Sequence, residues 1–174
     1  KTGRTHLMDA MPVDFSDELK AWSSQLTASR KMLGVIEDRF LEMPQGGTAV
    51  GSGINAHKQF AKIFAKELAK LSGSNCKCVA SSNFFHELSA QDCSVQLSGE
   101  LKNLAVILMK ISNDLRWMNS GPLAGLSEIE LQALQPGSSI MPGKVNPVIP
   151  EAVTMVSADV IGNDVSITVA AQAG

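Results

Sequence analysis

The feature that most constrains the fold is a regular row of apolar residues in the second half of the chain. The spacing along this row alternates between four and three without exception, through Leu97, Leu101, Leu104, Leu108, Ile111, Leu115 and Met118. A seven-residue repeat of this kind is typical of one helix packing lengthwise against another. We therefore predict one long helix over residues 84–119. At about 1.5 Å per residue it would extend for roughly 50 Å, a length typical of elongated helical bundles.

The remaining patterns also favour helices. A second seven-residue seam predicts a helix over residues 15–43, and apolar stripes predict helices over residues 57–72 and from Glu151 to Val169. Residues 1–13 have no such pattern and are expected to be irregular. No segment sustains the alternation of a half-buried strand. The fold class that we predict is all-α, an elongated bundle of long helices whose seams associate with other copies of the chain.

Composition limits the expected partners and compartment. The 174 residues carry 15 Lys and Arg against 17 Asp and Glu, a formal net charge of −2, whereas a nucleic-acid-binding domain is usually basic. Residues 104–109 form the longest uninterrupted apolar run, which is too short to cross a membrane, and no targeting segment is visible. The three cysteines, Cys76, Cys78 and Cys93, have a poor spacing for a disulfide or a metal site. We expect reduced thiols, as in the cytoplasm.

Residues 137–147, GSSIMPGKVNP, interrupt the helical pattern. Two glycines and two prolines in eleven residues are incompatible with a regular helix. Asn146 is a good N-cap and Pro147 a good first residue for the helix that follows. The loop therefore leads into a helix N-terminus, where backbone N–H groups and the helix dipole favour anions, and Lys144 adds a full positive charge.

Ser138 is the candidate reactive group in this loop. A serine hydroxyl is a weak base or nucleophile unless its alkoxide is stabilised. Backbone N–H groups shaped by the two glycines, the Lys144 ammonium and the helix N-terminus could supply that stabilisation. Lys144 and Asn146 could equally bind a substrate carboxylate. The structural alternative is an ordinary capped helix start, which accounts for most Gly-Ser-Ser loops.

These eleven residues resemble, without departure, the signature of the fumarase/aspartase superfamily. Four more segments follow the same order as in the family, and the last three are similar to class II fumarate hydratases: residues 3–7 (GRTHL), 47–55 (GTAVGSGIN), 113–117 (NDLRW) and 161–164 (IGND). The chain is therefore identified as a member of this superfamily, with its closest resemblance to the class II fumarate hydratase family. The similarity runs through all 174 residues.

The resemblance implies a fold, a reaction and an assembly. Residues 1–174 would be the central helical domain of a longer chain, with its N-terminal and C-terminal domains outside this piece. The reaction would be reversible hydration of fumarate to L-malate, without a metal or organic cofactor. Long helices would form the core of a homotetramer, each site would combine residues from different subunits, and this piece alone would be inactive. The compartment would be the cytoplasm, or the mitochondrial matrix in a eukaryote.

The resemblance also implies roles for seven residues. Ser138 would be the base that takes the proton next to a carboxylate. His6, polarised by Glu151, would act on the hydroxyl side. The other four would hold the substrate carboxylates: Thr5, Ser139, Lys144 and Asn146. On periodicity alone, His6 is better explained as a surface imidazole.

Two alternatives to the hydratase stay open. Met8, Met11 and Leu123 stand where the family usually has Gln, Thr and Arg, and residues 147–151 and 170–174 look more like aspartase. Aspartate ammonia-lyase is therefore the alternative activity. The alternative from another class is a non-catalytic helical assembly module that keeps the loop only as a helix cap.

Overall fold

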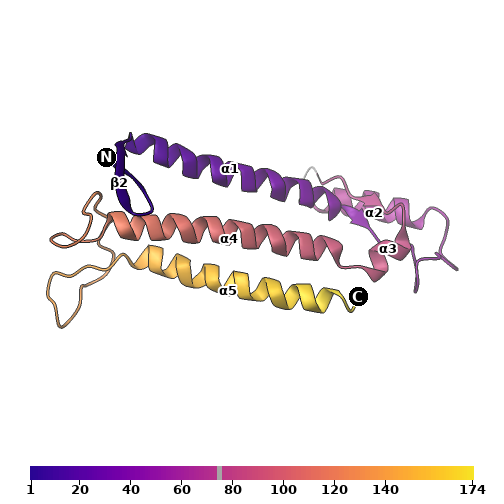
Figure 1. The fold of residues 1–174 in the computed structure, drawn as a ribbon. Coiled ribbons are helices and arrows are strands. Elements are labelled where there is room, and N and C mark those ends of the chain that lie inside the picture. The colour runs from indigo at the N-terminus through magenta and orange to yellow at the C-terminus, as the bar shows by residue number, and fades with distance from the viewer. Residues whose placement is uncertain (74–75) are drawn as a thin grey trace. The chain divides into compact units, whose positions relative to one another are not determined.

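The computed structural model describes residues 1–73 and 76–174, and it confirms the all-α class (Figure 1). The described residues form five helices: α1 Phe15–Arg39, α2 Phe60–Leu71, α3 Phe84–Ser89, α4 Asp92–Met118 and α5 Val148–Ala171. They also form four short strands: β1 Thr2–Thr5, β2 Met8–Pro12, β3 Glu42–Met43 and β4 Val79–Ala80. Helices predicted over residues 57–72 and 151–169 correspond to α2 and α5.

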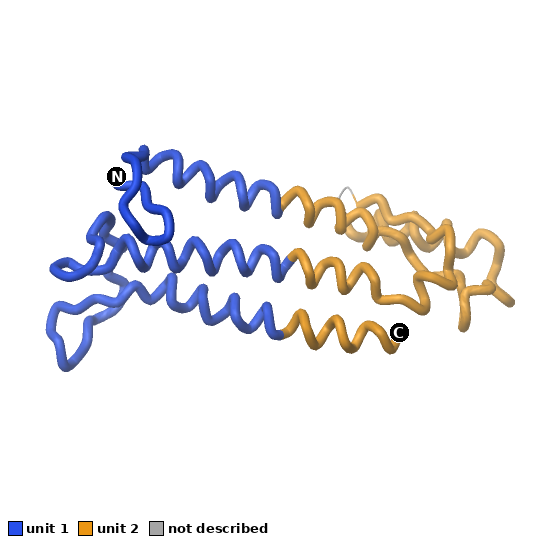
Figure 2. Tube along the Cα trace, in the orientation of Figure 1, with its two compact units in different colours: residues 1–29, 101–162 blue, residues 30–100, 163–174 orange. Residues whose placement is uncertain are grey.

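The chain divides into two compact units (Figure 2). Unit 1 contains residues 1–29 and 101–162, and unit 2 contains residues 30–100 and 163–174. Every predicted site residue therefore belongs to unit 1, whereas the three cysteines belong to unit 2.

Burial along the three longest helices repeats every seven residues. The buried positions that follow this period are Trp22, Ser29 and Ile36 in α1, Ser98, Ala105 and Ser112 in α4, and Pro150, Ser157 and Asp164 in α5; Met118, the last residue of α4, is also buried but lies outside the period. Four of these nine residues are serines. Because the distance between packed helices depends on side-chain size, small residues at these positions allow the backbones to approach closely. The seven-residue period predicted from the sequence is confirmed, although several of its largest apolar members lie outside the buried row.

Helix α5 has no distinct polar face, and many of its apolar side chains are exposed. Met155 exposes 67% of its surface, and Val156 and Val165 each expose 63%. An 18-residue window of α5 has a mean hydropathy of 1.2 with 11% of it buried, so the helix is long and apolar enough to cross a membrane. No uninterrupted apolar run in α5 is as long as residues 104–109, and the helix meets the criterion through its mean hydropathy, which its polar residues do not lower much. Core helices that pack on several sides meet the same criteria.

The helix predicted over residues 15–43 ends early, at Arg39. Residues beyond it join a small parallel sheet, in which β3 pairs with β4. The Val79 N–H donates to the Leu41 carbonyl at 2.9 Å, and the Ser81 N–H donates to the Met43 carbonyl at 3.0 Å. Pairing with a segment far along the chain therefore competes with the last helical turn.

The helix predicted over residues 84–119 is two helices, α3 and α4. Ala90 lies between them in an extended conformation, with φ −124° and ψ 148°. A contact of 2.8 Å between His86 Nε2 and Asp92 Oδ2 crosses the break. This hydrogen bond raises the pKa of His86, and the Glu87 and Asp92 charges add to the effect. Neither glycine nor proline marks the position, so the sequence carries no strong signal of the break.

Residues 1–13, expected to be irregular, form an antiparallel hairpin. β1 pairs with β2 in the register Arg4 to Asp9 and Thr5 to Met8. Two backbone hydrogen bonds of 2.9 Å between Lys1 and Val13 close its open end. The sequence hides the hairpin because every residue of β2 is exposed, which removes the alternation that identifies a half-buried strand.

Candidate active site

The hydroxyl of Ser138 lies inside a compact lobe of backbone formed by residues 138–144. Ser138 Oγ accepts hydrogen bonds from the N–H groups of Ile140 at 3.2 Å and Met141 at 3.3 Å. The Ser138 N–H donates to the Lys144 carbonyl at 3.2 Å, and the Lys144 N–H donates to the Met141 carbonyl at 3.1 Å. Two N–H dipoles directed at one oxygen favour negative charge there. The nest of donors that the sequence suggested is therefore present around Ser138.

Two glycines make the lobe sterically possible. A Cβ on Gly137 would lie 2.1 Å from the Lys144 carbonyl oxygen, far closer than real Cβ contacts. Gly143 has a φ of 85°, in the left-handed region that glycine adopts without strain. The Gly137 position is the tighter constraint, because the atom that it would meet belongs to the backbone.

Helix α5 begins at Val148, three residues before the predicted apolar stripe and one residue after Pro147, the first residue that the capping pattern predicts. The Glu151 N–H donates to the Pro147 carbonyl at 3.2 Å, and the first helical residue is Val148. Pro147 therefore supplies the first carbonyl of the helical ladder and stands at the N-cap, and Asn146 lies just outside the helix. Placing Asn146 at the N-cap was wrong by one residue, but the loop still leads directly into a helix N-terminus.

A cavity of about 450 Å³ lies beside this helix start. Three predicted site residues line it, Lys144, Asn146 and Glu151, together with Asn113 and Arg116 of α4. Arg116 Nη1 donates to Asn113 Oδ1 at 3.1 Å, so the guanidinium is held on this side of α4. Two cations and three amides line this cavity beside the single carboxylate of Glu151, so donors that suit a substrate carboxylate predominate. Sequence reasoning missed Arg116, although it lies within the NDLRW segment.

His6 stands at the tip of the hairpin in a strained conformation. His6 and Leu7, the two turn residues, have φ values of 54° and 61°. Two-residue hairpin turns of this hand normally use Asn and Gly, and a left-handed residue other than glycine costs roughly 1–2 kcal/mol. Both residues and the adjacent Thr5 are exposed in this chain. The surface position of His6 agrees with the interpretation from periodicity alone.

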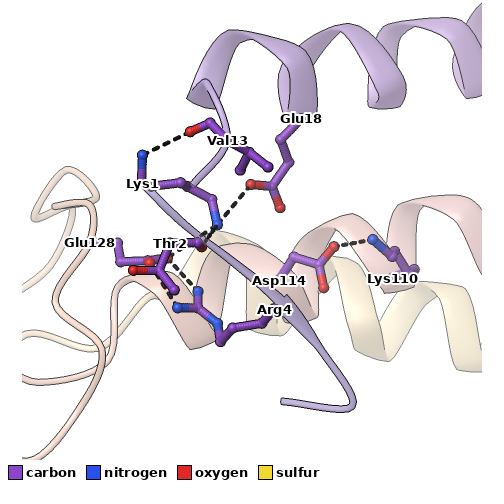
Figure 3. Close-up of polar contacts among 8 residues, drawn as sticks. All are labelled: Lys1, Thr2, Arg4, Val13, Glu18, Lys110, Asp114 and Glu128. Atoms are coloured by element: carbon purple, nitrogen blue, oxygen red, sulfur yellow. Dashed lines mark hydrogen bonds and ion pairs between the residues drawn. The ribbon is translucent and has the colours of Figure 1, made fainter. Parts of the chain in front are cut away.

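The carboxylate of Glu128, on another segment of unit 1, binds Arg4 of the hairpin (Figure 3). Glu128 accepts two hydrogen bonds from Arg4, Nη1 to Oε1 at 2.8 Å and Nη2 to Oε2 at 2.6 Å. Lys1 Nζ lies 3.5 Å from Glu128 and 3.2 Å from Glu18. The Arg4 hydrogen bonds, followed by the Lys1 charge, lower the pKa of Glu128, and the same contact raises the pKa of Arg4.

The side chain of Glu128 is only 14% exposed. The Arg4 side chain is 16% exposed. The Met118 carbonyl accepts hydrogen bonds from the N–H groups of Glu128 at 2.8 Å and Ile129 at 3.3 Å. These two bonds hold the segment after α4 against the end of that helix. No sequence pattern identifies the pair, because 124 residues separate its members.

His6 lines a second cavity, of about 580 Å³, with residues of the hairpin, α1 and α4. Trp117 lines this cavity and also the cavity at the start of α5. Thr5, Ser138 and Ser139 line neither. Within residues 1–73 and 76–174, no hydrogen bond or ion pair joins His6 to Glu151 or Ser138, so the pairing of His6 with Glu151 stays a prediction. No group of three or more His, Cys, Asp or Glu in those ranges is arranged to hold a metal ion.

Comparisons with known proteins agree on one family. The sequence model of a family described as lyase matches residues 1–162. Over 174 residues the chain is 59% identical to fumarate hydratase class II 2 of Pseudomonas aeruginosa, and it covers 38% of that protein. It is 57% identical to fumarate hydratase class II of Xylella fastidiosa, and it covers 36% of that protein. The crystal structure of class II fumarase from Schistosoma mansoni aligns over the whole chain with a TM-score of 0.93 and 36% identity, and the chain covers 39% of it.

Proposed function

Because the chain belongs to the lyase family whose model matches residues 1–162, we propose that it is the central helical domain of an enzyme that reversibly hydrates fumarate to L-malate. The chain spans 38% of the length of the Pseudomonas aeruginosa relative, so the activity is assigned to the complete protein. The substrate class is a small dicarboxylate. The proposed compartment is the cytoplasm, with neither nucleic acid nor membrane as a partner.

The observation that carries this proposal is the geometry around Ser138. Its Oγ receives two backbone N–H groups, from Ile140 and Met141, inside a lobe whose shape is fixed by further backbone hydrogen bonds. Preorganised donors of this kind stabilise negative charge without rearranging during the reaction. Ser138 can therefore act as an alkoxide base that removes the proton from the carbon next to a substrate carboxylate. In the reverse direction, the Ser138 hydroxyl returns that proton to fumarate.

The other residues divide between binding and the second proton transfer. Lys144 and Asn146 share one cavity and are assigned to a substrate carboxylate. Thr5 and Ser139 are assigned to the remaining carboxylate contacts. His6, supported by Glu151, is assigned to the hydroxyl side, where it removes a proton from water during hydration. Ser138 and His6 thus act on opposite sides of the double bond.

Self-association accounts for two observations at once. His6 and Ser138 do not share a cavity in one chain, and α5 leaves large apolar side chains exposed. A homotetramer that buries the apolar helix faces would cover these side chains and could bring His6 of one chain to Ser138 of another. A group of large apolar side chains exposed to water is typical of an interaction surface.

The decisive experiment uses the complete protein. Fumarate is supplied with and without ammonium, and the product is identified by proton NMR for the wild type, Ser138→Ala and Ser23→Ala. Ser23 is an exposed residue of α1 and serves as the matched control. We expect malate in both conditions, loss of at least about 1,000-fold in kcat for Ser138→Ala since an essential proton-transfer group is removed, and normal turnover for Ser23→Ala.

Two outcomes would contradict the proposal. Aspartate formed only when ammonium is present would identify an aspartate ammonia-lyase, with Ser138 still the base and His6 without its assigned role. Unchanged turnover in Ser138→Ala would remove the catalytic role of the lobe and favour a helical assembly module.

A further inference from the structure

Two cysteines of unit 2 lie close enough to react with each other. Cys76 Sγ and Cys78 Sγ are 3.1 Å apart, and both residues are half-buried. A disulfide bond is about 2.05 Å long, so the sulfurs need to approach by only about 1 Å. The spacing in the sequence argued against a disulfide, whereas the folded backbone brings the two thiols into contact.

A basic groove lies beside this pair. It has a volume of about 660 Å³ and is lined by Cys78, by β4 and by three lysines one helical turn apart on α2: Lys62, Lys66 and Lys70. Lys70 pairs with Glu67 at 2.6 Å, and no ion pair in the described part of the chain includes Lys62 or Lys66. Positive charge along a groove raises the local concentration of anions. Cys78 therefore lines a surface that attracts negatively charged solutes, and the Cys76 sulfur lies 3.1 Å from the Cys78 sulfur.

We propose that Cys76 and Cys78 form a dithiol–disulfide pair that exchanges with an anionic disulfide drawn to this groove. In the first step, the Cys76 thiolate attacks one sulfur of that disulfide, and the other sulfur leaves as a thiolate. In the second step, the Cys78 thiolate attacks the Cys76 sulfur of the mixed disulfide and expels the second thiolate. The protein gives up two electrons and two protons, and the disulfide is reduced to two thiols.

The order of attack follows from the contact between the thiols. The hydrogen bond with Cys76 is the main cause that raises the pKa of Cys78. Because the raised pKa makes Cys78 a poorer source of thiolate, Cys78 is assigned the second attack and Cys76 the first. Disulfides that are exposed or strained are readily reduced again, so the exchange is reversible. This chemistry is independent of the proposed hydration, whose residues all belong to unit 1.

The test uses the complete, fully reduced protein and two probes of opposite charge, oxidised glutathione and cystamine. Reactions are quenched with acid, free thiols are alkylated, and the products are identified by intact mass and peptide mapping. In the wild type and in the matched control Cys93→Ser, we expect a disulfide between Cys76 and Cys78. Cys78→Ser should stop at a mixed disulfide on Cys76, because the second sulfur is missing.

The role of the groove is tested by the ratio of the two rates. Because electrostatic attraction acts on the anionic probe alone, Lys62→Gln with Lys66→Gln should reduce the rate ratio of oxidised glutathione to cystamine by about tenfold at low salt. High salt should reduce the wild-type ratio in the same way. Failure of the wild type to form the disulfide with either probe would overturn the proposal. An unchanged rate ratio in the lysine variant would overturn the selection of anionic disulfides.

Discussion

Two parts of unit 1 carry the proposed catalytic residues, and different kinds of interaction hold them in place. The hairpin tip that carries His6 is strained at both turn residues, and a charged pair between Arg4 and Glu128 fastens it to a distant segment. The lobe around Ser138 is held by hydrogen bonds within residues 138–144 and by the missing side chain at Gly137. Position is therefore set by a long-range charge contact in one case and by local backbone geometry in the other.

This difference predicts which changes each part tolerates. A side chain that carries charge can be neutralised by one substitution or by acid, and the hairpin should respond to both. Backbone hydrogen bonds do not depend on side-chain identity. The conformation of the lobe should therefore be insensitive to acid and to most substitutions. The lobe should fail where a new Cβ meets the backbone.

The largest effect is expected for Gly137→Ala, which places a Cβ against the Lys144 carbonyl. The lobe must open, and Ser138 loses its two N–H donors. In the complete protein we expect kcat/KM for malate formation to fall by at least about 100-fold, the usual effect of losing such a donor. Gly99→Ala is the control, because that Cβ meets nothing within 4 Å, and it should stabilise α4 by about 0.5–1 kcal/mol. Normal turnover in Gly137→Ala would show that catalysis does not need the closed lobe.

A smaller effect is expected for Glu128→Gln, which leaves the mostly buried Arg4 without its anionic partner. The free energy of unfolding of unit 1 should fall by about 1–3 kcal/mol, measured by urea denaturation, because a charged hydrogen-bonded pair is lost. The exposed neighbour Glu130 provides the control, and Glu130→Gln should change stability by less than about 0.5 kcal/mol. Equal effects from the two substitutions would mean that the pair does not anchor the hairpin.

Acid should destabilise the hairpin and leave the lobe unaffected. Because the folded protein lowers the pKa of Glu128, the stabilisation is fully present above the ordinary glutamate pKa and is lost as pH falls through the lowered value. Hydrogen exchange at residues 2–12 should accelerate over that range, whereas exchange at Ser138 and Lys144, corrected for intrinsic rates, should not. The Glu128→Gln variant should lack the acid-induced change at the hairpin. If acid lowered protection equally in the hairpin and the lobe, the predicted difference in their acid sensitivity would be wrong.

The smallest effect is expected at the turn itself. Leu7→Gly relieves the left-handed strain but adds freedom to the unfolded chain, so we expect a net gain of about 0.5 kcal/mol, visible as a slightly higher Tm. Met8→Gly is the matched control, since Met8 belongs to strand β2 and is exposed. There glycine should destabilise by about 0.5–1 kcal/mol. Destabilisation by Leu7→Gly would mean that the leucine side chain contributes more than the turn strain costs.

The sequence predicted the parts of this molecule that depend on local pattern. Seven-residue spacing identifies helices that pack lengthwise, and burial in α1, α4 and α5 follows that period. The two glycines of residues 137–147 indicated a nest of N–H groups, because glycine at these positions has a direct backbone consequence. The hairpin was missed because β2 is exposed throughout and shows no alternation, and the break before Asp92 was missed because neither glycine nor proline marks it.

The site was predicted less completely than the fold. Lys144, Asn146 and Glu151 are near in sequence, and they line one cavity. Arg116 and Glu128 were missed as functional or anchoring groups, because a single charged residue has no pattern of its own and its partner cannot be read from spacing. The proposed meeting of His6 and Ser138 involves a second chain, and no pattern within one chain encodes such a contact.

The His6–Leu7 turn has a consequence for the history of such a protein. A turn of two left-handed residues without glycine lowers stability, and replacement of Leu7 by glycine would relieve part of that cost. Selection for heat resistance alone would be expected to accept that replacement early. Selection for turnover would reject the glycine replacement if greater mobility of the turn displaced the His6 imidazole from its catalytic position. A library evolved under the two pressures separately should therefore diverge at this turn before it diverges along the helices.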